Sequence, residues 1–434
     1  MGERDFAGPG DGASAKQRDV GNRVVRGAER PGFPRGLPGD GAAGRGVDGE
    51  DLAPCALADA QVQADVFAHL PVETMDAQQG RKQPVPFYRE WLKHPVRDEH
   101  WLGRSLDAQV AAISIPTLFY TGWYDYFLRG NLADYERVMK AADAGSAARA
   151  NHRLIVGPWA HYTGRDGATR QVGDLDFGDP AAYDLPARLL GWYDQWLKGM
   201  PDRYAGDGPV KIFVMGDNAW RSEKAWPLPD AQYTKYYLAS SGRANTAGGD
   251  GTLSTAEPKG AAQDRFIYDP ANPVPTVGGV SGGPAGPREQ GALATRDDIL
   301  SYTSAPLAAR LEVTGPIKVT LFAATDARDT DFTAKLVDVH PDGKAYNIVD
   351  GVIRARYRQG VEKARLVTPG AVLEYTIDLW STSHAFLPGH RLRVDISSSN
   401  FPRLDRNLNT AESPERSTAM VKARQTIVHD AAHP

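Results

Sequence analysis

The sequence predicts an α/β section followed by an all-β section in one chain. Two short apolar runs that close at glycines, with a helical pattern between them, predict parallel strands joined by a crossover helix. After about residue 205, segments in which apolar and polar residues alternate are separated by clusters of Gly, Pro, Asp and Asn. This second pattern is typical of a β-sandwich, and we expect about eight strands of jelly-roll type.

Length, composition and charge define the broad class of protein. The chain has 434 residues, of which 41% are hydrophobic, so it is long enough for two domains with sizeable cores. A net charge of −4 without clustered Lys and Arg argues against a nucleic-acid partner. The single cysteine, Cys55, excludes an intramolecular disulfide and a zinc site built from thiolates. No apolar run is long enough to span a membrane and no signal-peptide pattern is visible, so we expect a soluble protein with no membrane partner and favour the cytoplasm.

Three regions follow one another along the chain. Residues 1–56 are rich in Gly, Arg, Ala, Asp and Pro and lack hydrophobic periodicity, so we expect them to be disordered; a sharper hypothesis is that they are not native coding sequence. We assign residues 57–205 to the α/β domain and residues 206–434 to the β-sandwich domain.

The α/β region is expected to contain helices and strands in this order. Aromatic residues and leucines at helical spacing over 84–106, interrupted by Pro95, predict two short helices. The run IPTLFYTGWYD (115–125) predicts a buried strand, LADYERVMKAA (132–142) a helix and RLIVGPW (153–159) a second buried strand. The segment DLPARLLGWYDQWLKG (184–199) predicts a helix with Asp184 as N-cap and Gly199 as its end.

Seven later segments alternate with the period of a strand. They are VKIFVMG (210–216), TKYYLAS (234–240), DRFIYDP (264–270), IKVTLFAAT (317–325), FTAKLVDV (332–339), VLEYTIDLW (372–380) and HRLRVDISSS (390–399). We expect all of them in the β-sandwich.

An acid and a base follow the two predicted α/β strands. Asp125 comes directly after the first strand and His161 just beyond the second. Because ligands in open α/β sheets bind beyond the carboxyl ends of the strands, the two side chains can converge there. An Asp that orients a His, which in turn activates a serine hydroxyl, is the arrangement of a hydrolytic triad. Taken singly, the Asp could equally be a turn residue and the His a structural one.

Three other patterns in the sequence do not predict a catalytic or metal-binding site. Gly279–Gly283 satisfies the G-x-S-x-G elbow pattern, but prolines and glycines flank Ser281 where a strand and a helix are required, so a glycine loop is expected. Asp326, Asp329 and Asp331 lack the spacing of a calcium loop and are expected at turns and strand edges. His94 and His100 lack the H-E-x-x-H pattern of zinc proteases. We therefore assign no metal and no cofactor.

Several motifs, in the correct order, resemble the X-Pro dipeptidyl-peptidase and cocaine esterase family of serine hydrolases. They are GWYDYF, GPWAH, the helix WYDQWLKG, the loop NPVPTVGG and the segment FLPGHRLRVDISSSNFPRLDRNLNT. The resemblance spans roughly Pro84 to Asn409. It implies an α/β-hydrolase domain with a helical cap, followed by a jelly-roll domain of the galactose-binding type that helps to wall the active site. It also implies that Asp125 and His161 are the acid and the base of the triad.

The resemblance also bears on the substrate. In the α-amino-acid ester hydrolase branch, two acidic residues follow the triad Asp at the second and third positions, whereas here these positions are Phe127 and Leu128. This is similar to the esterase and acylase branches, so Phe127 is expected to line a pocket for an apolar acyl group; simple core packing is the alternative. We expect a small ester, amide or short peptide as substrate, with the oligomeric state, homo-oligomer included, left open.

One part of the family pattern is not found. The family carries its nucleophile in a G-x-S-Y-x-G elbow before the cap, and neither this elbow nor the early oxyanion-hole tyrosine is present. Only about seventy residues separate residue 56 from Asp125, too few for the missing strands and the whole cap. We therefore expect a hydrolase chain that begins inside the cap and lacks its serine. The alternatives are an inactive truncated remnant that acts as a binding or interaction module, and a serine supplied by a separately encoded N-terminal half.

Overall fold

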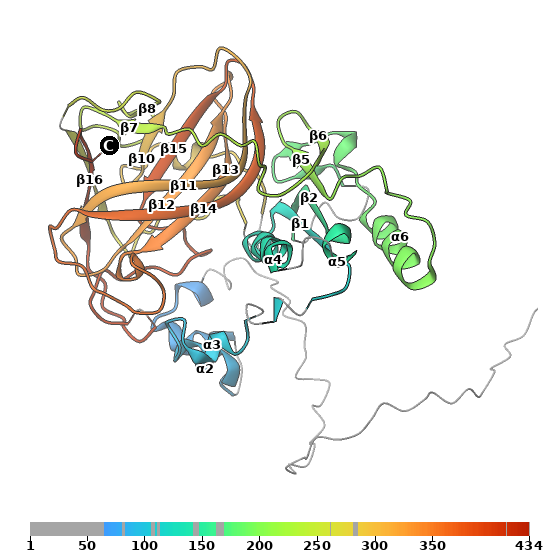
Figure 1. Ribbon diagram of the computed structural model, residues 1–434. Helices are drawn as coiled ribbons and strands as arrows, with labels where there is room; N and C mark the ends of the chain where they lie inside the picture. The colour runs from blue at the N-terminus through green and yellow to red at the C-terminus, as the bar shows by residue number, and fades with distance from the viewer. Residues whose placement is uncertain are drawn as a thin grey trace, which may run out of the picture. The chain divides into compact units, whose positions relative to one another are not determined.

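The computed structural model describes residues 65–79, 83–105, 109–110, 113–141, 147–161, 169–260, 262–280, 285–413 and 415–433 (Figure 1). The segment 1–56 and Ser281 lie outside the described residues, so the expected disorder and the elbow serine itself are not described. Residues 57–434 group into one compact unit. In the described part of the chain, no helix is both long and apolar enough to cross a membrane.

The α/β sheet has four strands in the order β1-β2-β5-β6. Strand β1 (Leu118–Tyr124) pairs parallel with β2 (Arg153–Ala160), and β2 pairs parallel with β5 (Val210–Val214), which pairs antiparallel with β6 (Ala219–Glu223). Helix α4 (Leu128–Ala141) connects β1 to β2, followed by the short α5 (Ala147–Asn151). The predicted strand–helix–strand unit with parallel strands is therefore confirmed.

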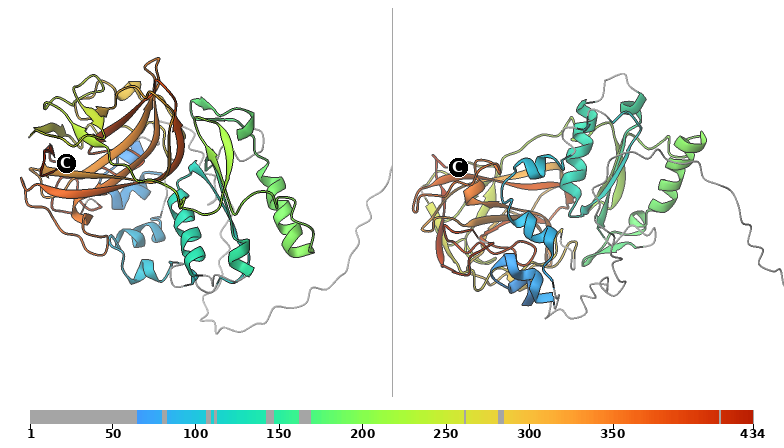
Figure 2. Two further views of the ribbon diagram at one scale, coloured as in Figure 1. Left: turned by 45° about the horizontal axis from the view of Figure 1, so that its top comes forward. Right: turned by 90° about the horizontal axis from the view of Figure 1, so that it is seen from below.

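Helices cover both faces of this sheet. Figures 1 and 2 show α4 on one face and α6 (Leu185–Lys198) on the other. Helix α6 begins and ends as predicted: the Asp184 carboxylate accepts a hydrogen bond from the backbone N–H of Ala187, and Gly199 ends the helix with φ +68°. On its buried face, the Arg188 guanidinium lies 4.3 Å from the ring centre of Tyr204. Two parallel buried strands therefore have a packed helix on either side.

One predicted strand belongs to a different sheet from the one expected. The segment 210–216 was assigned to the β-sandwich, but its strand β5 pairs with β2 in the α/β sheet, and β6 follows it there. The prediction was wrong because four of the five residues of β5 are buried, all but Lys211. A short apolar stretch with one lysine has the same sequence pattern in a parallel core strand as in a half-buried sandwich strand. The domain boundary at residues 205 and 206 stays a prediction.

Two further sheets form the β-rich part of the chain (Figures 1 and 2). The six-stranded sheet has the order β13-β12-β15-β10-β8-β7, with strands β13 (Ala345–Arg354), β12 (Asp331–Val339), β15 (Arg391–Ser397), β10 (Leu300–Thr303), β8 (Thr252–Ser254) and β7 (Tyr237–Ala239). The four-stranded sheet has the order β14-β11-β16-β9, with β14 (Leu373–Phe386), β11 (Leu311–Thr325), β16 (Ala423–His429) and β9 (Ala262–Tyr268). Apolar side chains of both sheets share one core cluster. An α/β part followed by a β-rich part is thus confirmed, whereas the jelly-roll topology stays a prediction.

The remaining elements are short. Before the sheets lie η1 (Val72–Gln79), α2 (Pro86–Leu92) and α3 (Glu99–Leu102), so the two predicted helices flanking Pro95 are confirmed. The other short elements are β3 (Gln171–Val172), β4 (Leu175–Asp176), η4 (Asp179–Ala181), η5 (Gly291–Leu293) and η6 (Ala355–Tyr357).

Backbone hydrogen bonds join the α/β sheet to the β-rich part. Just after β5, the N–H of Met215 donates to the carbonyl of Ser383 (3.0 Å), and the N–H of Ala385 donates to the carbonyl of Met215 (2.8 Å). Near the end of β1, the Tyr124 hydroxyl donates to the carbonyl of Asn347 in β13 (3.3 Å). The carboxyl end of β1, where the predicted site lies, is therefore held against β13.

Candidate active site

The two predicted site residues stand at the carboxyl ends of neighbouring parallel strands. The last paired residues of β1 and β2 are Tyr124 and Ala160, and Asp125 and His161 follow directly. Parallel strands end at the same edge of a sheet, which brings the side chains that follow them together. His161 Nδ1 lies 3.2 Å from Asp125 Oδ1, so the predicted meeting of the two side chains is confirmed.

Two glycines allow the strands to approach as they do. The register of β1 and β2 shifts between Gly122 and Tyr124. A Cβ atom on Gly122 would lie 2.1 Å from the carbonyl oxygen of Trp159, and one on Gly157 would lie 2.3 Å from the indole of Trp159. Only glycine fits at these positions without moving a strand or the indole, and the resulting offset aligns the ends of β1 and β2.

The backbone at the start of α4 fixes the Asp125 carboxylate. Asp125 is 2% exposed, and its Oδ1 accepts a hydrogen bond from the N–H of Phe127 (2.9 Å) as well as from His161. Its own carbonyl accepts from the N–H of Leu128, where α4 begins (2.9 Å). Because a carboxylate can only accept, Nδ1 of His161 is the donor, and Nε2 is then the basic nitrogen of the neutral ring.

Two aromatic rings contact the imidazole. The ring centre of Phe127 lies 5.2 Å from that of His161 in an edge-to-face arrangement (75°), and that of Tyr126 lies 4.4 Å away, tilted by 35°. Phe127 is 54% exposed, so the alternative of core packing is wrong for this side chain. The sequence alone gave no role to Tyr126. Its position between Asp125 and Phe127 could have indicated that its ring lies near the imidazole.

The described residues on either side of Ser281 do not have the backbone of a nucleophile elbow. Gly279 and Gly286 exchange two backbone hydrogen bonds of 2.8 and 2.9 Å across the segment, and both have positive φ (+81° and +101°). The described residues that follow, from 285 to 290, form no helix. The flanks are those of a turn, as expected, and lack the strand–turn–helix that a nucleophile requires.

The acidic residues at 326–331 have protein partners. Asp329 accepts from Nε of Arg356 at 2.7 Å, and Asp331 accepts from Nε of Arg354 at 2.9 Å. Asp326 accepts a backbone N–H at 2.8 Å. Their carboxylates brace strand ends, which agrees with the expected turn and strand-edge roles.

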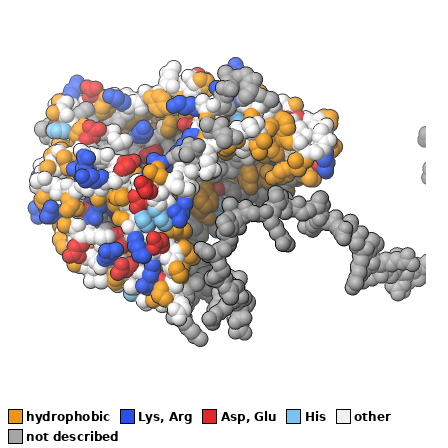
Figure 3. Space-filling model, turned by 60° about the horizontal axis from the view of Figure 1, so that its bottom comes forward, with side chains coloured by type: hydrophobic (Ala, Val, Ile, Leu, Met, Phe, Trp, Pro, Cys, Tyr) orange, Lys and Arg blue, Asp and Glu red, His pale blue; other side chains and the backbone are white. Residues whose placement is uncertain are grey.

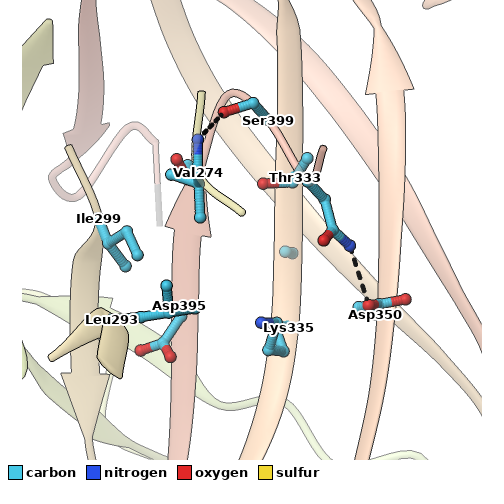
Figure 4. Close-up of a pocket in the computed structure, with 11 residues that line it drawn as sticks. Val274, Leu293, Ile299, Thr333, Lys335, Asp350, Asp395 and Ser399 are labelled. Atoms are coloured by element: carbon cyan, nitrogen blue, oxygen red, sulfur yellow. Dashed lines mark hydrogen bonds between the residues drawn. The ribbon is translucent and has the colours of Figure 1, made fainter. Parts of the chain in front are cut away.

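A pocket on the six-stranded sheet is filled by a polar network. Figure 4 shows Lys335 of β12 between Asp395 and Asp350, its register partners on β15 and β13. Lys335 Nζ donates to Gln290 Oε1 (2.7 Å), Asp350 accepts from Asn400 (3.1 Å), and burial lowers the pKa of Lys335. These groups satisfy one another, so we assign the pocket a bracing role.

The surface shows charges of both signs. On the face drawn in Figure 3, Lys and Arg side chains lie interspersed with Asp and Glu side chains. Ion pairs across the described surface include Arg310 with Asp217 and Arg288 with Asp174.

Family comparisons match most of the chain. Residues 204–434 match the model of the X-Pro dipeptidyl-peptidase C-terminal non-catalytic domain, and residues 43–163 match that of X-Pro dipeptidyl-peptidase (S15 family). The second match includes both Asp125 and His161.

Individual relatives point the same way. The chain is 43% identical over 327 residues to a cocaine esterase of Rhodococcus sp. (strain MB1 Bresler). The aligned region covers 74% of this chain and 54% of that protein. It is similar in structure to an α-amino acid ester hydrolase (TM-score 0.73, 26% identity) and to an aminopeptidase of a marine sediment Thaumarchaeota archaeon (TM-score 0.72, 27% identity), each match covering 86% of this chain and 62% of the other. The chain therefore spans about half the length of the curated relative.

Proposed function

Because the chain belongs to the X-Pro dipeptidyl-peptidase family, we propose that Asp125 and His161 are the acid and the base of a serine-hydrolase site for esters or amides. The observation that carries the proposal is the hydrogen bond of 3.2 Å between His161 Nδ1 and the buried Asp125 carboxylate, at the ends of two parallel strands. The order of Asp before His along the chain is that of α/β-hydrolases.

In this proposal, each of the two residues has its own step. Nε2 of His161 takes the proton of the serine hydroxyl as the hydroxyl attacks the carbonyl carbon, and then gives that proton to the leaving alcohol or amine. The Asp125 carboxylate holds the ring in the tautomer with its proton on Nδ1 and stabilises the imidazolium that forms. The backbone N–H of Phe127 fixes the same carboxylate oxygen, so the acid is oriented before substrate binds.

The acyl group is placed against the exposed aromatic ring beside the base. Phe127 lies edge-on to His161, and Leu128 is 1% exposed. Because both side chains are apolar, neither position offers a carboxylate for a substrate ammonium. We infer an apolar acyl group. The β-rich part, as a jelly-roll sandwich, would wall this pocket; the bond from Tyr124 to Asn347 supports its position beside the site.

The hydrolase proposal assigns the nucleophile to no serine of the 434 residues. The one G-x-S-x-G sequence has flanks that bridge each other as a turn, so Ser281 is not proposed as nucleophile. In the hydrolase proposal, the serine comes from polypeptide outside these 434 residues. The same observation supports a second candidate: an inactive member of the family in which the β-rich part binds a ligand or partner.

One experiment separates the two candidates. The genomic sequence upstream of codon 57 is read in all three frames, and the product that carries an elbow serine is assayed with p-nitrophenyl esters of apolar acids. We expect His161→Ala and Asp125→Asn each to lower kcat/KM by about 10⁴-fold or more. Asp179→Asn, whose side chain is 91% exposed, is the matched control and should leave the rate unchanged. A His161→Ala enzyme with an unchanged rate would refute the proposed base.

A second arm uses the 434-residue chain alone. A fluorophosphonate probe labels serines that an adjacent base activates. We expect no labelled serine in this chain. Labelling of Ser281 that disappears in His161→Ala would place the nucleophile in the glycine loop and overturn our assignment. Absence of any elbow serine upstream, together with absence of labelling, would favour the inactive binding module.

A further inference from the structure

Three histidines surround one buried aspartate in the β-rich part, away from Asp125 and His161. The side chain of Asp338, near the end of β12, is 3% exposed. Its Oδ1 lies 2.9 Å from His390 Nδ1, and its Oδ2 lies 2.9 Å from His384 Nε2 and 3.5 Å from His340 Nε2. The histidines come from the β12–β13 turn, from β14 and from the residue before β15. Three separate segments of the chain thus bring imidazole nitrogens to one carboxylate.

The ligand atoms of Asp338, His340 and His390 have the spacing of a cation site. All three lie within 4.8 Å of one another. Zinc binds nitrogen and oxygen at about 2.0–2.2 Å, so its tetrahedral ligand atoms lie about 3.4 Å apart. Shifts of about an ångström would therefore bring the three atoms to one ion. Imidazole and carboxylate are ligands that zinc and its neighbours in the transition series accept.

His384 is placed to hold the carboxylate. Its Nε2 bonds to Asp338 Oδ2, and its side chain is only 5% exposed. Carboxylates that bind metals are commonly held by a further hydrogen bond of this kind.

One of the three residues is reached by solvent. His340 lies in the turn after β12, where its backbone N–H donates to the carbonyl of Lys344 (2.8 Å), and its side chain is 28% exposed. An ion can approach from this side. Three protein ligands leave the fourth tetrahedral position to water.

We propose that Asp338, His340 and His390 form a binding site for a divalent cation of the zinc type, with His384 orienting the Asp338 carboxylate. These ligands are spread over about fifty residues and match no short motif, so the sequence alone does not predict a metal here. The site would tie the β12–β13 turn to the start of β15. It would lie next to the strand pairing of Met215 with β14, because His384 is the residue between the two bonding partners of Met215.

A second histidine cluster provides a contrast. Glu90, His94 and His100 also bring ligand atoms within 4.8 Å of one another. However, the rings of His94 and His100 are stacked, with centres 4.0 Å apart and planes 14° apart, whereas those of His340 and His390, with centres 4.3 Å apart, are tilted by 43°. Lone pairs lie in the ring planes, so stacked rings direct them side by side and do not converge on one ion. This cluster supplies the matched control.

The test is a titration of the chelator-treated chain with Co²⁺, followed by the visible absorption of tetrahedral Co²⁺, and competition by Zn²⁺. We expect one equivalent of Co²⁺ to bind and Zn²⁺, which takes nitrogen and oxygen ligands in tetrahedral geometry, to displace it. His340→Ala should weaken binding at least 100-fold without unfolding the chain, because His340 is partly exposed. His384→Gln should weaken binding by about 10–100-fold. His94→Ala should bind as the wild type does.

Two results would overturn the proposal. One is the absence of saturable binding of one Co²⁺ or Zn²⁺ per chain at micromolar concentration, which would make the cluster a hydrogen-bonded brace. The other is equal affinity in wild type and His340→Ala. Circular dichroism and a Zn²⁺-induced rise in melting temperature, expected for wild type and absent in His340→Ala, separate loss of binding from loss of fold.

Discussion

Replacement of Gly122 by alanine tests whether the close approach of β1 and β2 builds the site. The added Cβ would lie 2.1 Å from the carbonyl oxygen and 2.6 Å from the carbonyl carbon of Trp159. Both are backbone atoms of β2, so no side-chain rotation relieves the clash. The strands would have to part by about 1 Å, which separates Asp125 from His161 as well.

The expected cost is that of overpacking. Forcing an extra methyl into a packed interior costs about 1–3 kcal/mol. For a urea dependence of about 2 kcal/mol per molar, the unfolding midpoint should fall by about 0.5–1.5 M. Tryptophan fluorescence reports on this region directly, because Trp123 and Trp159 lie on the two strands and are fully buried.

Gly130→Ala is the matched control. Gly130 lies in α4, and a Cβ there would meet nothing within 4 Å. Alanine favours a helix over glycine by up to about 1 kcal/mol, so this variant should be as stable as the wild type or more stable. An unchanged midpoint in Gly122→Ala, or an equal fall in both variants, would refute the close-approach argument.

Three further outcomes follow from the contacts described. Asp329→Ala removes a fully buried partner of the Arg356 guanidinium and should cost about 3–5 kcal/mol, measured by urea unfolding, because the guanidinium is left without its counter-charge. Burial lowers the pKa of His152, whose Nδ1 accepts from the N–H of Thr117. Below pH ~6.5 the unfolded chain therefore binds a proton at His152 that the folded chain does not bind, so the free energy of unfolding falls as the pH drops from 7.5 to 5.5. His152→Gln should show a smaller fall in melting temperature over the same pH range. Phe127→Ala should leave stability within about 0.5 kcal/mol, since the ring is 54% exposed, while it raises KM for esters of apolar acids in the elbow-bearing product.

The α/β unit was predictable because its signals are local. Continuous apolar runs mark strands that are buried on both faces, and the residues just past them must lie at one sheet edge. The pairing of Asp125 with His161 followed from these two facts alone. The caps of α6 were also readable, because an N-cap carboxylate and a C-terminal glycine act within one turn.

Other features depend on contacts between distant residues. The place of β5 could not be read from its letters, since a buried strand has the same composition in either sheet. The exposure of Phe127 depends on what packs over the start of α4. The cluster around Asp338 joins residues 338 and 390, whose meeting is set by the pairing of β12 with β15. No short motif encodes such a contact.

The most direct test of the Asp125–His161 pair is the Nδ1 proton of His161, observed by NMR in a chain labelled with ¹⁵N-histidine. We expect a downfield proton bonded to Nδ1 and hydrogen-bonded to Asp125, assigned by its loss in His161→Gln and shifted upfield in Asp125→Asn. An Nδ1 that carries no proton at neutral pH, or a signal unaffected by Asp125→Asn, would contradict the acid–base pair on which the proposed function rests.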